Sequence, residues 1–229
     1  MKNKSRVIRS IAPVAKAGTR VRELKLKASW ASSNFKIETV CLSAGPSYLE
    51  DETSVSQASH FLLEEVHKAV NAGCCGIIID CFTDPLLEEC RQISTIPIVG
   101  AGRSALCSGW SLGKSIAVII PTERMQRFIS KEVGKHGIPV ARWDYVFCED
   151  KAEEVIHSST QKTTHALREA YSRCSKLADI DVIVLGCTAL EPYWLEILMN
   201  EAEYKNLPVI LPFRAAVMNL EMLIGNLRT

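Results

Sequence analysis

Two segments of the sequence repeat one another, and each carries a cysteine at the same place in the repeat. In both segments an apolar, β-type run ends on a cysteine, Cys81 or Cys187, and a stretch of helix length follows. A proline and two branched residues come next, and an arginine stands four residues further on, at Arg103 and Arg214. Such matched spacing predicts that the chain contains a duplicated unit.

Apolar runs alternate with helical patterns along the whole chain, which is typical of a parallel sheet covered by helices on both faces. We therefore expect an α/β fold of two pseudo-symmetric three-layer lobes. Each lobe should hold a four-stranded parallel sheet flanked by helices, with the active site in the cleft between the lobes. The predicted strands are residues 7–11, 36–42, 76–80, 96–99, 115–120, 143–148, 182–185 and 209–211. The predicted helices are residues 54–72, 84–93, 122–136, 151–177, 190–203 and 215–227.

The lobe boundary is expected in residues 108–114, where Gly109, Ser111 and Gly113 interrupt a helix before the next strand. The predicted domains are an N-terminal α/β lobe of residues 1–110 joined by the C-terminal helix 214–229, and a C-terminal α/β lobe of residues 111–213.

The composition describes an intracellular globular protein. Of 229 residues, 47% are hydrophobic and 23% charged, with a net charge of +1, so neither disorder nor a nucleic-acid partner is indicated. The nine cysteines are odd in number and dispersed along the chain, which is typical of proteins in a reducing compartment. No apolar stretch is long enough for a signal peptide or a membrane span. We therefore expect a cytoplasmic protein without a membrane partner.

The two repeated cysteines are expected at the carboxyl ends of parallel strands, directly before helices, where ligands bind in open α/β sheets. A helix amino terminus favours negative charge, so it can lower the pKa of a thiol from about 8.5 toward neutrality. If the two lobes pack about a pseudo-twofold axis, both thiols meet across one cleft, which is a geometry for moving a proton.

Polar residues beside each thiol fit this chemistry. Thr83 and Thr188 can each offer a hydroxyl and a backbone N–H to a substrate oxygen as carbanion charge develops. An acidic residue and a proline then follow, and they are predicted to open the next helices. These pairs are Asp84-Pro85 and Glu191-Pro192.

Three strings resemble the Asp/Glu/hydantoin racemase superfamily, and most closely its hydantoin and allantoin racemases. They are CFTDPL at residues 81–86, VLGCTA at 184–189, and Gly45-Pro46-Ser47 with Glu50. The resemblance implies a cofactor-independent isomerase of two pseudo-symmetric lobes. In that family one cysteine, as thiolate, removes the proton beside a carbonyl and the other returns a proton to the opposite face. It therefore implies that Cys81 and Cys187 are the catalytic residues of a racemase or epimerase.

The resemblance also places the loop at residues 45–47 on the substrate pocket. Ser47, Thr83 and Thr188 are expected to hold carbonyl or carboxylate oxygens, and Phe82 to contact the side group of the substrate. The substrate-binding candidates are Pro13, Pro46, Ser47, Phe82, Thr83, Gly186 and Thr188.

The sequence departs from the family pattern at three places, and two of them make the pocket more apolar. Residues 12–15 read Ala-Pro-Val-Ala where the family usually has Asn-Pro-Asn-Thr, and Leu211 stands where an Asp is often found. Asp80, directly before Cys81, is the third departure. It either points to the other face of the strand or raises the pKa of the thiol by repulsion.

Three alternatives stay open. A decarboxylase or a cis-trans isomerase of the same superfamily would use the same thiols. The glycines of residues 100–105 (GAGRSA), followed by Glu123, fit the dinucleotide fingerprint of an NAD(P)-binding oxidoreductase, although Gly109 and Gly113 interrupt the following helix. A non-catalytic ligand-binding protein is the third. Under the racemase interpretation we expect no metal or organic cofactor, a small-molecule substrate with a carbonyl or carboxylate, and a homo-oligomer, a dimer or larger.

Overall fold

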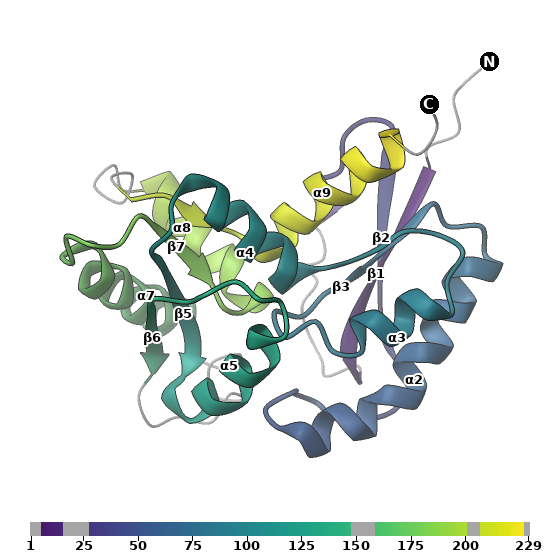
Figure 1. Cartoon of the computed structure of the whole chain (residues 1–229), viewed down its shortest axis with the longest axis horizontal. Helices are drawn as coiled ribbons and strands as arrows, with labels where there is room; N and C mark the ends of the chain where they lie inside the picture. The colour runs from purple at the N-terminus through teal and green to yellow at the C-terminus, as the bar shows by residue number, and fades with distance from the viewer. Residues whose placement is uncertain (1–5, 16–27, 148–158, 201–206, 227–229) are drawn as a thin grey trace. The chain divides into compact units, whose positions relative to one another are not determined.

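The computed structural model describes residues 6–15, 28–147, 159–200 and 207–226. The chain divides into two compact units, one of residues 1–104 with 213–229 and one of residues 105–212. Figure 1 labels most of the helices and strands of both units. The division into two lobes expected from the sequence, with a boundary after residue 110, stays a prediction.

The first unit is built on a parallel sheet of four strands in the order β2-β1-β3-β4. The central strand β3 consists of a glycine and three isoleucines, and all four residues are buried. Such a continuous branched run forms a strand because both of its faces are covered. The strands are β1 (Arg6–Ala15), β2 (Phe35–Leu42), β3 (Gly76–Ile79) and β4 (Ile98–Gly100).

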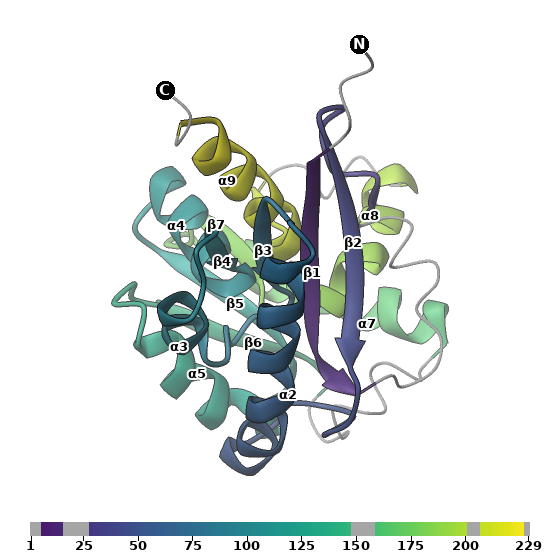
Figure 2. The ribbon, with the colours of Figure 1, turned by 90° about the vertical axis from the view of Figure 1, so that its right-hand side faces the viewer.

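Helices cover both faces of this first sheet, and Figure 2 shows its strands β1 and β2 lengthwise, running vertically. On one face α2 (Glu52–Asn71) and α3 (Leu87–Gln92) pack against Ile77 and Ile79. On the other face α9 (Pro212–Asn226) packs against Ile78, which lies between them in sequence. The three layers predicted from the sequence are therefore present in this unit.

Helix α2 shows how the sequence determines where a helix begins and which of its faces is buried. Its buried positions, Ala58, Leu62, Val66 and Ala69, follow a helical period, so they form one apolar face. Asp51 caps the helix, since its carboxylate accepts a hydrogen bond of 2.7 Å from the backbone N–H of Ser54. A cap of this kind stabilises a helix by about 1 kcal/mol.

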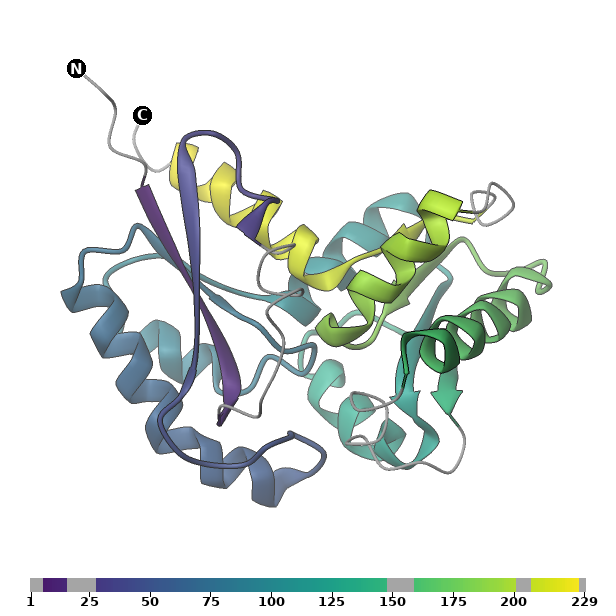
Figure 3. The ribbon, with the colours of Figure 1, turned by 180° about the vertical axis from the view of Figure 1, so that it is seen from behind.

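The second unit repeats the arrangement with a parallel sheet in the order β6-β5-β7-β8. Figure 3 shows α7 and α8, in green and yellow-green, beside this sheet. Its strands are β5 (Ile116–Thr122), β6 (Arg142–Phe147), β7 (Val182–Leu185) and β8 (Val209–Ile210). Its helices are α4 (Ala101–Leu112), which begins in the first unit, α5 (Gln126–Gly134), α7 (Thr160–Ser175) and α8 (Glu191–Asn200).

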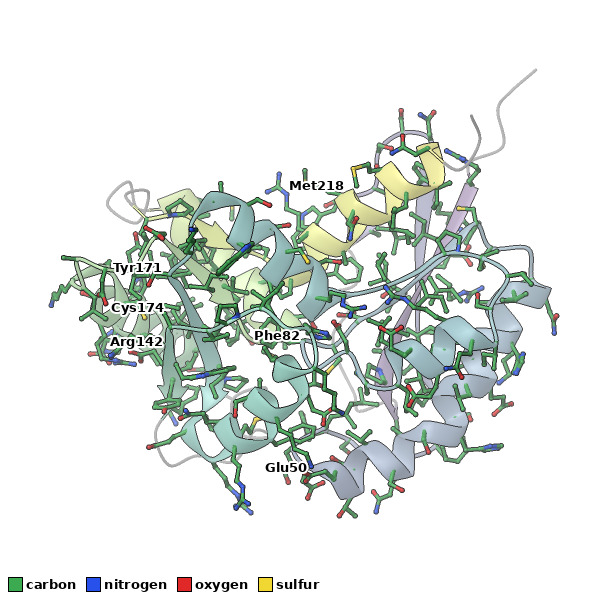
Figure 4. All side chains as sticks on the ribbon, in the orientation of Figure 1. Glu50, Phe82, Arg142, Tyr171, Cys174 and Met218 are labelled. Carbon is green, nitrogen blue, oxygen red and sulfur yellow. The ribbon has the colours of Figure 1, made fainter. Side chains whose placement is uncertain are left out.

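A buried carboxylate ties α7 to β6. Asp144 is 3% exposed and accepts hydrogen bonds from the Nε and Nη2 atoms of Arg173, at 2.9 and 2.6 Å. Arg142 donates a further bond of 3.1 Å to the same carboxylate. Cys174 is fully buried beside this cluster, and burial raises the pKa of its thiol to about 11. Figure 4 labels Arg142 and Cys174 among the side chains of this unit.

The two sheets match residue by residue. The N–H of Asp80, after β3, donates 2.9 Å to the carbonyl of Ile11, and the N–H of Gly186, after β7, donates 2.7 Å to that of Ile119. The prolines of the repeat match as well. Pro97 and Pro208 each accept a bond of 2.9 Å at their carbonyls, from Ile77 and Ile183 respectively. The duplicated unit predicted from the sequence is therefore present as two sheets whose strands pair in the same register.

Several predicted helix limits were wrong. The helix expected at residues 84–93 begins only at Leu87, and that expected at 122–136 opens with the 3-10 turn η1 (Glu123–Met125) before α5. The last helix begins at Pro212 rather than residue 215. The glycine at 109 does not interrupt α4, which runs to Leu112. The expected starts and ends within residues 148–158, 201–206 and 227–229 lie outside the described residues.

In the described parts of the chain, no helix is both long and apolar enough to pass through a membrane.

Candidate active site

The two repeated cysteines occupy the same place in the two units. Cys81 lies two residues after β3 and Cys187 two residues after β7, and both are partly buried. The carbonyl of Cys81 accepts a hydrogen bond of 3.2 Å from the N–H of Asp84, and that of Cys187 one of 3.1 Å from the N–H of Leu190. Each thiol therefore opens a tight turn at the carboxyl edge of its own sheet.

A hydroxyl lies beside the first thiol. The Sγ of Cys81 is 3.2 Å from the Oγ1 of Thr83, and either atom can donate. Thr83 and Phe82 are both buried, at 5% and 2% exposed. The Thr83 hydroxyl is therefore held next to the sulfur, where it can donate to sulfur or to a substrate oxygen.

Asp84 does not open the helix that follows the first thiol, contrary to the sequence expectation. Its backbone is left-handed, with φ of 47°, and Leu86 follows with φ of 53°, so α3 cannot begin before Leu87. The Asp84 carboxylate instead accepts bonds of 2.9 and 2.6 Å from the N–H groups of Gly102 and Arg103. It therefore caps α4, and the helix expected from residue 84 begins only at Leu87, as α3.

The same contacts explain the glycines of the dinucleotide-like string. A Cβ on Gly102 would lie 1.8 Å from the carbonyl oxygen of Phe82, and one on Gly100 would lie 2.2 Å from the Cγ of Asp84. Both glycines are therefore needed for the close approach of the turn after Cys81. In a dinucleotide site the first amides of the helix bind the pyrophosphate, but here the Asp84 carboxylate accepts them, so this alternative is wrong.

Asp80 points away from the first thiol. It is 6% exposed, and its Oδ2 lies 3.5 Å from the Oγ of Ser10. Side chains alternate along a strand, so Asp80 shares the face of Ile78 and α9. Cys81 packs with the core of the opposite face. Of the two alternatives for Asp80, the structure supports the one in which it faces the other side of the sheet.

The second thiol has the helix that the sequence predicts. Cys187 is the extended N-cap residue of the 3-10 turn η2 (Thr188–Leu190), which leads into α8. Thr188 is 6% exposed, and Glu191, fully buried, begins α8 as expected. Gly186 is required before the thiol, because a Cβ there would lie 2.5 Å from the Cγ2 of Ile120.

The expected pocket loop lies against the end of β1. The carbonyl of Pro46 accepts a bond of 2.8 Å from the N–H of Ala15, and Gly45 takes a φ of 120° that favours glycine. Ser47 is exposed and Pro13 is buried. The structure therefore brings the loop at residues 45–47 to the carboxyl edge of the first sheet, while the substrate-binding roles of these residues stay a prediction.

Thr122 is a further candidate site residue, which sequence reasoning missed. It ends β5, so it stands at the same edge of the second sheet as Thr188. It is fully buried, and its hydroxyl has no hydrogen-bond partner among the described residues. Buried polar groups are normally paired, so such a hydroxyl points to a ligand or a water. In the repeat, Pro121-Thr122 of β5 corresponds to Pro13-Val14 of β1, so this position could be found from the sequence, but not the burial of its hydroxyl.

Within the described residues, no three His, Cys, Asp or Glu side chains come together in a group that could hold a metal ion.

Comparison with known proteins places the chain in a family. The family model described as Asp/Glu/Hydantoin racemase matches residues 18–220. The chain belongs to this family. It is 22% identical over 190 residues to a hydantoin racemase of Paenarthrobacter aurescens, covering 82% of this chain and 78% of that one.

Solved structures show the same fold. An allantoin racemase from Klebsiella pneumoniae superposes with a TM-score of 0.79 at 21% identity, covering 97% of this chain and 89% of that one. An arylmalonate decarboxylase superposes with a TM-score of 0.61 at 12% identity, covering 96% of this chain and 92% of that one. The two-lobed α/β architecture with two parallel sheets, predicted from the sequence, is confirmed.

Proposed function

We propose that this protein is a cofactor-independent racemase or epimerase that acts on a carbon next to a carbonyl, with Cys81 and Cys187 as its two proton carriers. The observation that carries the proposal is the matched position of the thiols. Each follows the corresponding strand of its sheet by two residues and opens a turn closed by the same type of backbone bond. Family membership supports the same chemistry.

In the proposed reaction one cysteine, as thiolate, takes the proton from the stereocentre. The electron pair of the C–H bond moves into the neighbouring carbonyl and gives an enolate. The other cysteine, as thiol, then donates its proton to the opposite face of the carbon. The product is the mirror-image centre, and the two sulfurs have exchanged protonation states. Each cysteine is thus a base for one enantiomer and an acid for the other.

The hydroxyls beside the thiols stabilise the enolate in this proposal. Thr83 is held 3.2 Å from the Cys81 sulfur, and Thr188 follows Cys187 directly. Thr122 adds a buried hydroxyl at the same edge as Thr188. Donors that are already in place where negative charge develops lower the barrier without reorganisation.

The proposed substrates are small cyclic amides with an acidic ring C–H, in the class of hydantoins and allantoin. The similar proteins are named hydantoin racemase and allantoin racemase. Residues 12–15, which carry apolar side chains where the family usually has amides and a hydroxyl, favour a neutral ring with an apolar substituent over a substrate with a second carboxylate.

The test is to incubate single enantiomers of 5-substituted hydantoins, allantoin and free amino acids in deuterium oxide. Optical rotation should decay to zero while the α-proton signal disappears from the proton NMR spectrum, and a Cys81→Ser, Cys187→Ser double variant should show neither change. Release of carbon dioxide or a moved double bond would instead identify a decarboxylase or cis-trans isomerase. Tight binding with no exchange by the wild-type protein would identify a binding protein.

A cytoplasmic location and a homo-oligomer are further parts of the proposal. The odd, dispersed set of nine cysteines fits a reducing compartment. Size-exclusion chromatography with light scattering measures the oligomeric state, and an isologous dimer is the commonest arrangement.

A further inference from the structure

We propose that Asp84 is a positioning residue for Cys81, because its buried carboxylate fixes the turn that carries the thiol to the first turn of α4. The inference rests on the proposed role of Cys81 as a proton carrier. It assigns to Asp84 no contact with the substrate.

Asp84 holds the turn from both of its ends. Its backbone N–H donates to the carbonyl of Cys81 at 3.2 Å. Its carboxylate accepts from the N–H groups of Gly102 and Arg103 at 2.9 and 2.6 Å, and the side chain is 5% exposed. One residue therefore connects the thiol turn to a helix of twelve residues. The negative charge faces the positive end of that helix, which strengthens both bonds.

The backbone of this turn is one that a free chain avoids. Asp84 and Leu86 both have left-handed backbones, with φ of 47° and 53°, and neither is glycine. Such conformations persist only where the surrounding structure fixes them. The two bonds to α4 supply that restraint at Asp84, so the shape of the turn depends on the carboxylate.

Backbone contact makes the connection stiff. The carbonyl of Phe82, one residue after the thiol, lies so close to Gly102 that a Cβ there would be 1.8 Å away. The turn and the helix therefore touch through their main chains, and a shift of one displaces the other. Asp84 helps to fix the distance between Phe82 and Gly102, because its carboxylate accepts a hydrogen bond from the N–H of Gly102.

At the second thiol an apolar residue takes this position. Leu190 stands at the position of Asp84, and its N–H makes the same bond to the carbonyl of Cys187. Its side chain is apolar and fully buried, so packing fixes that turn. A change at Asp84 should therefore alter Cys81 and leave Cys187 as it was.

The experiment compares Asp84→Ala, Asp84→Gly and Asp84→Asn with the wild type. Each full-length protein is alkylated with iodoacetamide from pH 6 to pH 10, and the rates at Cys81 and Cys187 are read separately by peptide mass spectrometry. We expect the Ala and Gly variants to change the rate, or the midpoint of its pH profile, at Cys81 by about tenfold or about one pH unit. Asn keeps one acceptor and tolerates a left-handed backbone, so its change should be smaller.

Glu88→Gln is the matched control. Glu88 also connects α3 to α4, by an ion pair of 2.7 Å with Arg103, but it is exposed, so its variant should leave both thiols unchanged. The proposal is overturned if Asp84→Gly keeps the wild-type profile while Asp84→Ala loses it, because then the backbone conformation alone matters. Equal changes at both thiols in all three variants, with a lowered melting temperature, would also overturn it, since they indicate general loosening.

An activity measurement separates this inference from the proposed function. In a Cys187→Ser background, Cys81 alone should exchange the α-proton of one enantiomer, and Asp84→Asn should slow that exchange. If no substrate of the panel exchanges in the wild type, the racemase proposal fails, but the alkylation result still decides whether Asp84 positions Cys81.

Discussion

The Oγ of Ser10 lies 3.5 Å from the Oδ2 of Asp80, and both residues are buried on one face of the first sheet. The corresponding residues of the second sheet are Val118 and Gly186. There a Cβ on the glycine would lie 3.0 Å from the Cγ1 of the valine. The position one residue before each thiol, on the opposite face of the sheet, is therefore filled differently in the two units. The first has a small hydroxyl and a carboxylate there, and the second has a branched side chain and a glycine.

Substitutions that give the first unit the residue pair of the second should show whether Ser10 and Asp80 interact. Ser10→Val alone removes the space and the hydroxyl beside a buried carboxylate, so it should lower the free energy of unfolding by about 1–3 kcal/mol. Adding Asp80→Gly recreates the pair of the second unit and should recover part of the loss. Urea unfolding of the two single variants and the double variant measures the coupling. Additive effects would show that the two side chains do not interact.

Gly186 should not tolerate even a methyl group. Gly186→Ala places a Cβ 2.5 Å from Ile120 and 3.1 Å from the carbonyl of Ile119, so we expect a loss of about 1–3 kcal/mol and reduced reactivity at Cys187. Gly225→Ala in α9 is the control, because a Cβ there meets nothing within 4 Å. It should stabilise the protein by up to about 1 kcal/mol. Thermal unfolding distinguishes the two, and similar shifts for both would contradict the packing argument.

Single-thiol variants should exchange without inverting. In Cys187→Ser the remaining thiol, Cys81, should exchange the α-proton of one enantiomer with deuterium, and Cys81→Ser should exchange that of the other. Racemisation should fall by about 10²–10⁴-fold in both, because one proton transfer loses its acid or base. Chiral chromatography combined with proton NMR reads both quantities. Exchange of both enantiomers by one variant would count against two opposed carriers.

Thr122 should show a split between stability and activity. Thr122→Val keeps the shape of the side chain but removes a buried hydroxyl that has no partner, so stability should stay the same or rise by about 1 kcal/mol. Activity should fall, mainly through a higher KM, if the hydroxyl binds substrate.

Thr163→Val is the control for Thr122. The Thr163 hydroxyl is also buried without a hydrogen-bond partner among the described residues, but it lies on α7 rather than at a strand end. It should show the same stability effect with unchanged activity. Equal activity of both variants would remove Thr122 from the site.

Two buried thiols should make stability fall at alkaline pH. Burial raises the pKa of Cys90 to about 12 and that of Cys174 to about 11. Unfolded thiols ionise near pH 8.5, so above that pH the unfolded chain loses protons that the folded chain keeps. Each thiol should therefore lower the free energy of unfolding by about 1.4 kcal/mol per pH unit between about pH 9 and 11. No such contribution is expected below pH 8.

Urea unfolding at pH 8, 9.5 and 10.5 measures this slope. Cys90→Ala and Cys174→Ala should each flatten it, whatever their cost at pH 8. Cys107, which is exposed, gives the control, since Cys107→Ala should leave the slope unchanged. A wild-type slope that persists in the Cys90, Cys174 double variant would assign it to other groups.

The sequence predicted the sheets well because their strands carry their own signal. Runs such as residues 76–79 and 182–185 are branched, apolar and short, so their secondary structure depends little on distant contacts. The match between Pro97 and Pro208 also revealed the register of the repeat, because proline stands at the same edge in both sheets.

The turn after Cys81 was not predictable in the same way. Asp84-Pro85 has the composition of a helix start, and only the distant amides of Gly102 and Arg103 select another conformation for it. The hidden hydroxyl of Thr122 was likewise invisible, because burial and the lack of a partner are properties of the folded chain.

Helix α9 is far in sequence from the strands that it covers. It buries the face of Ile8, Ile37 and Ile78, yet residues 105–212 separate it from the rest of the first unit. On the ribosome these isoleucines are therefore made early and stay uncovered until the last helix emerges, while the intervening unit already has all of its strands. A stalled or prematurely terminated chain would present this apolar surface to chaperones and proteases.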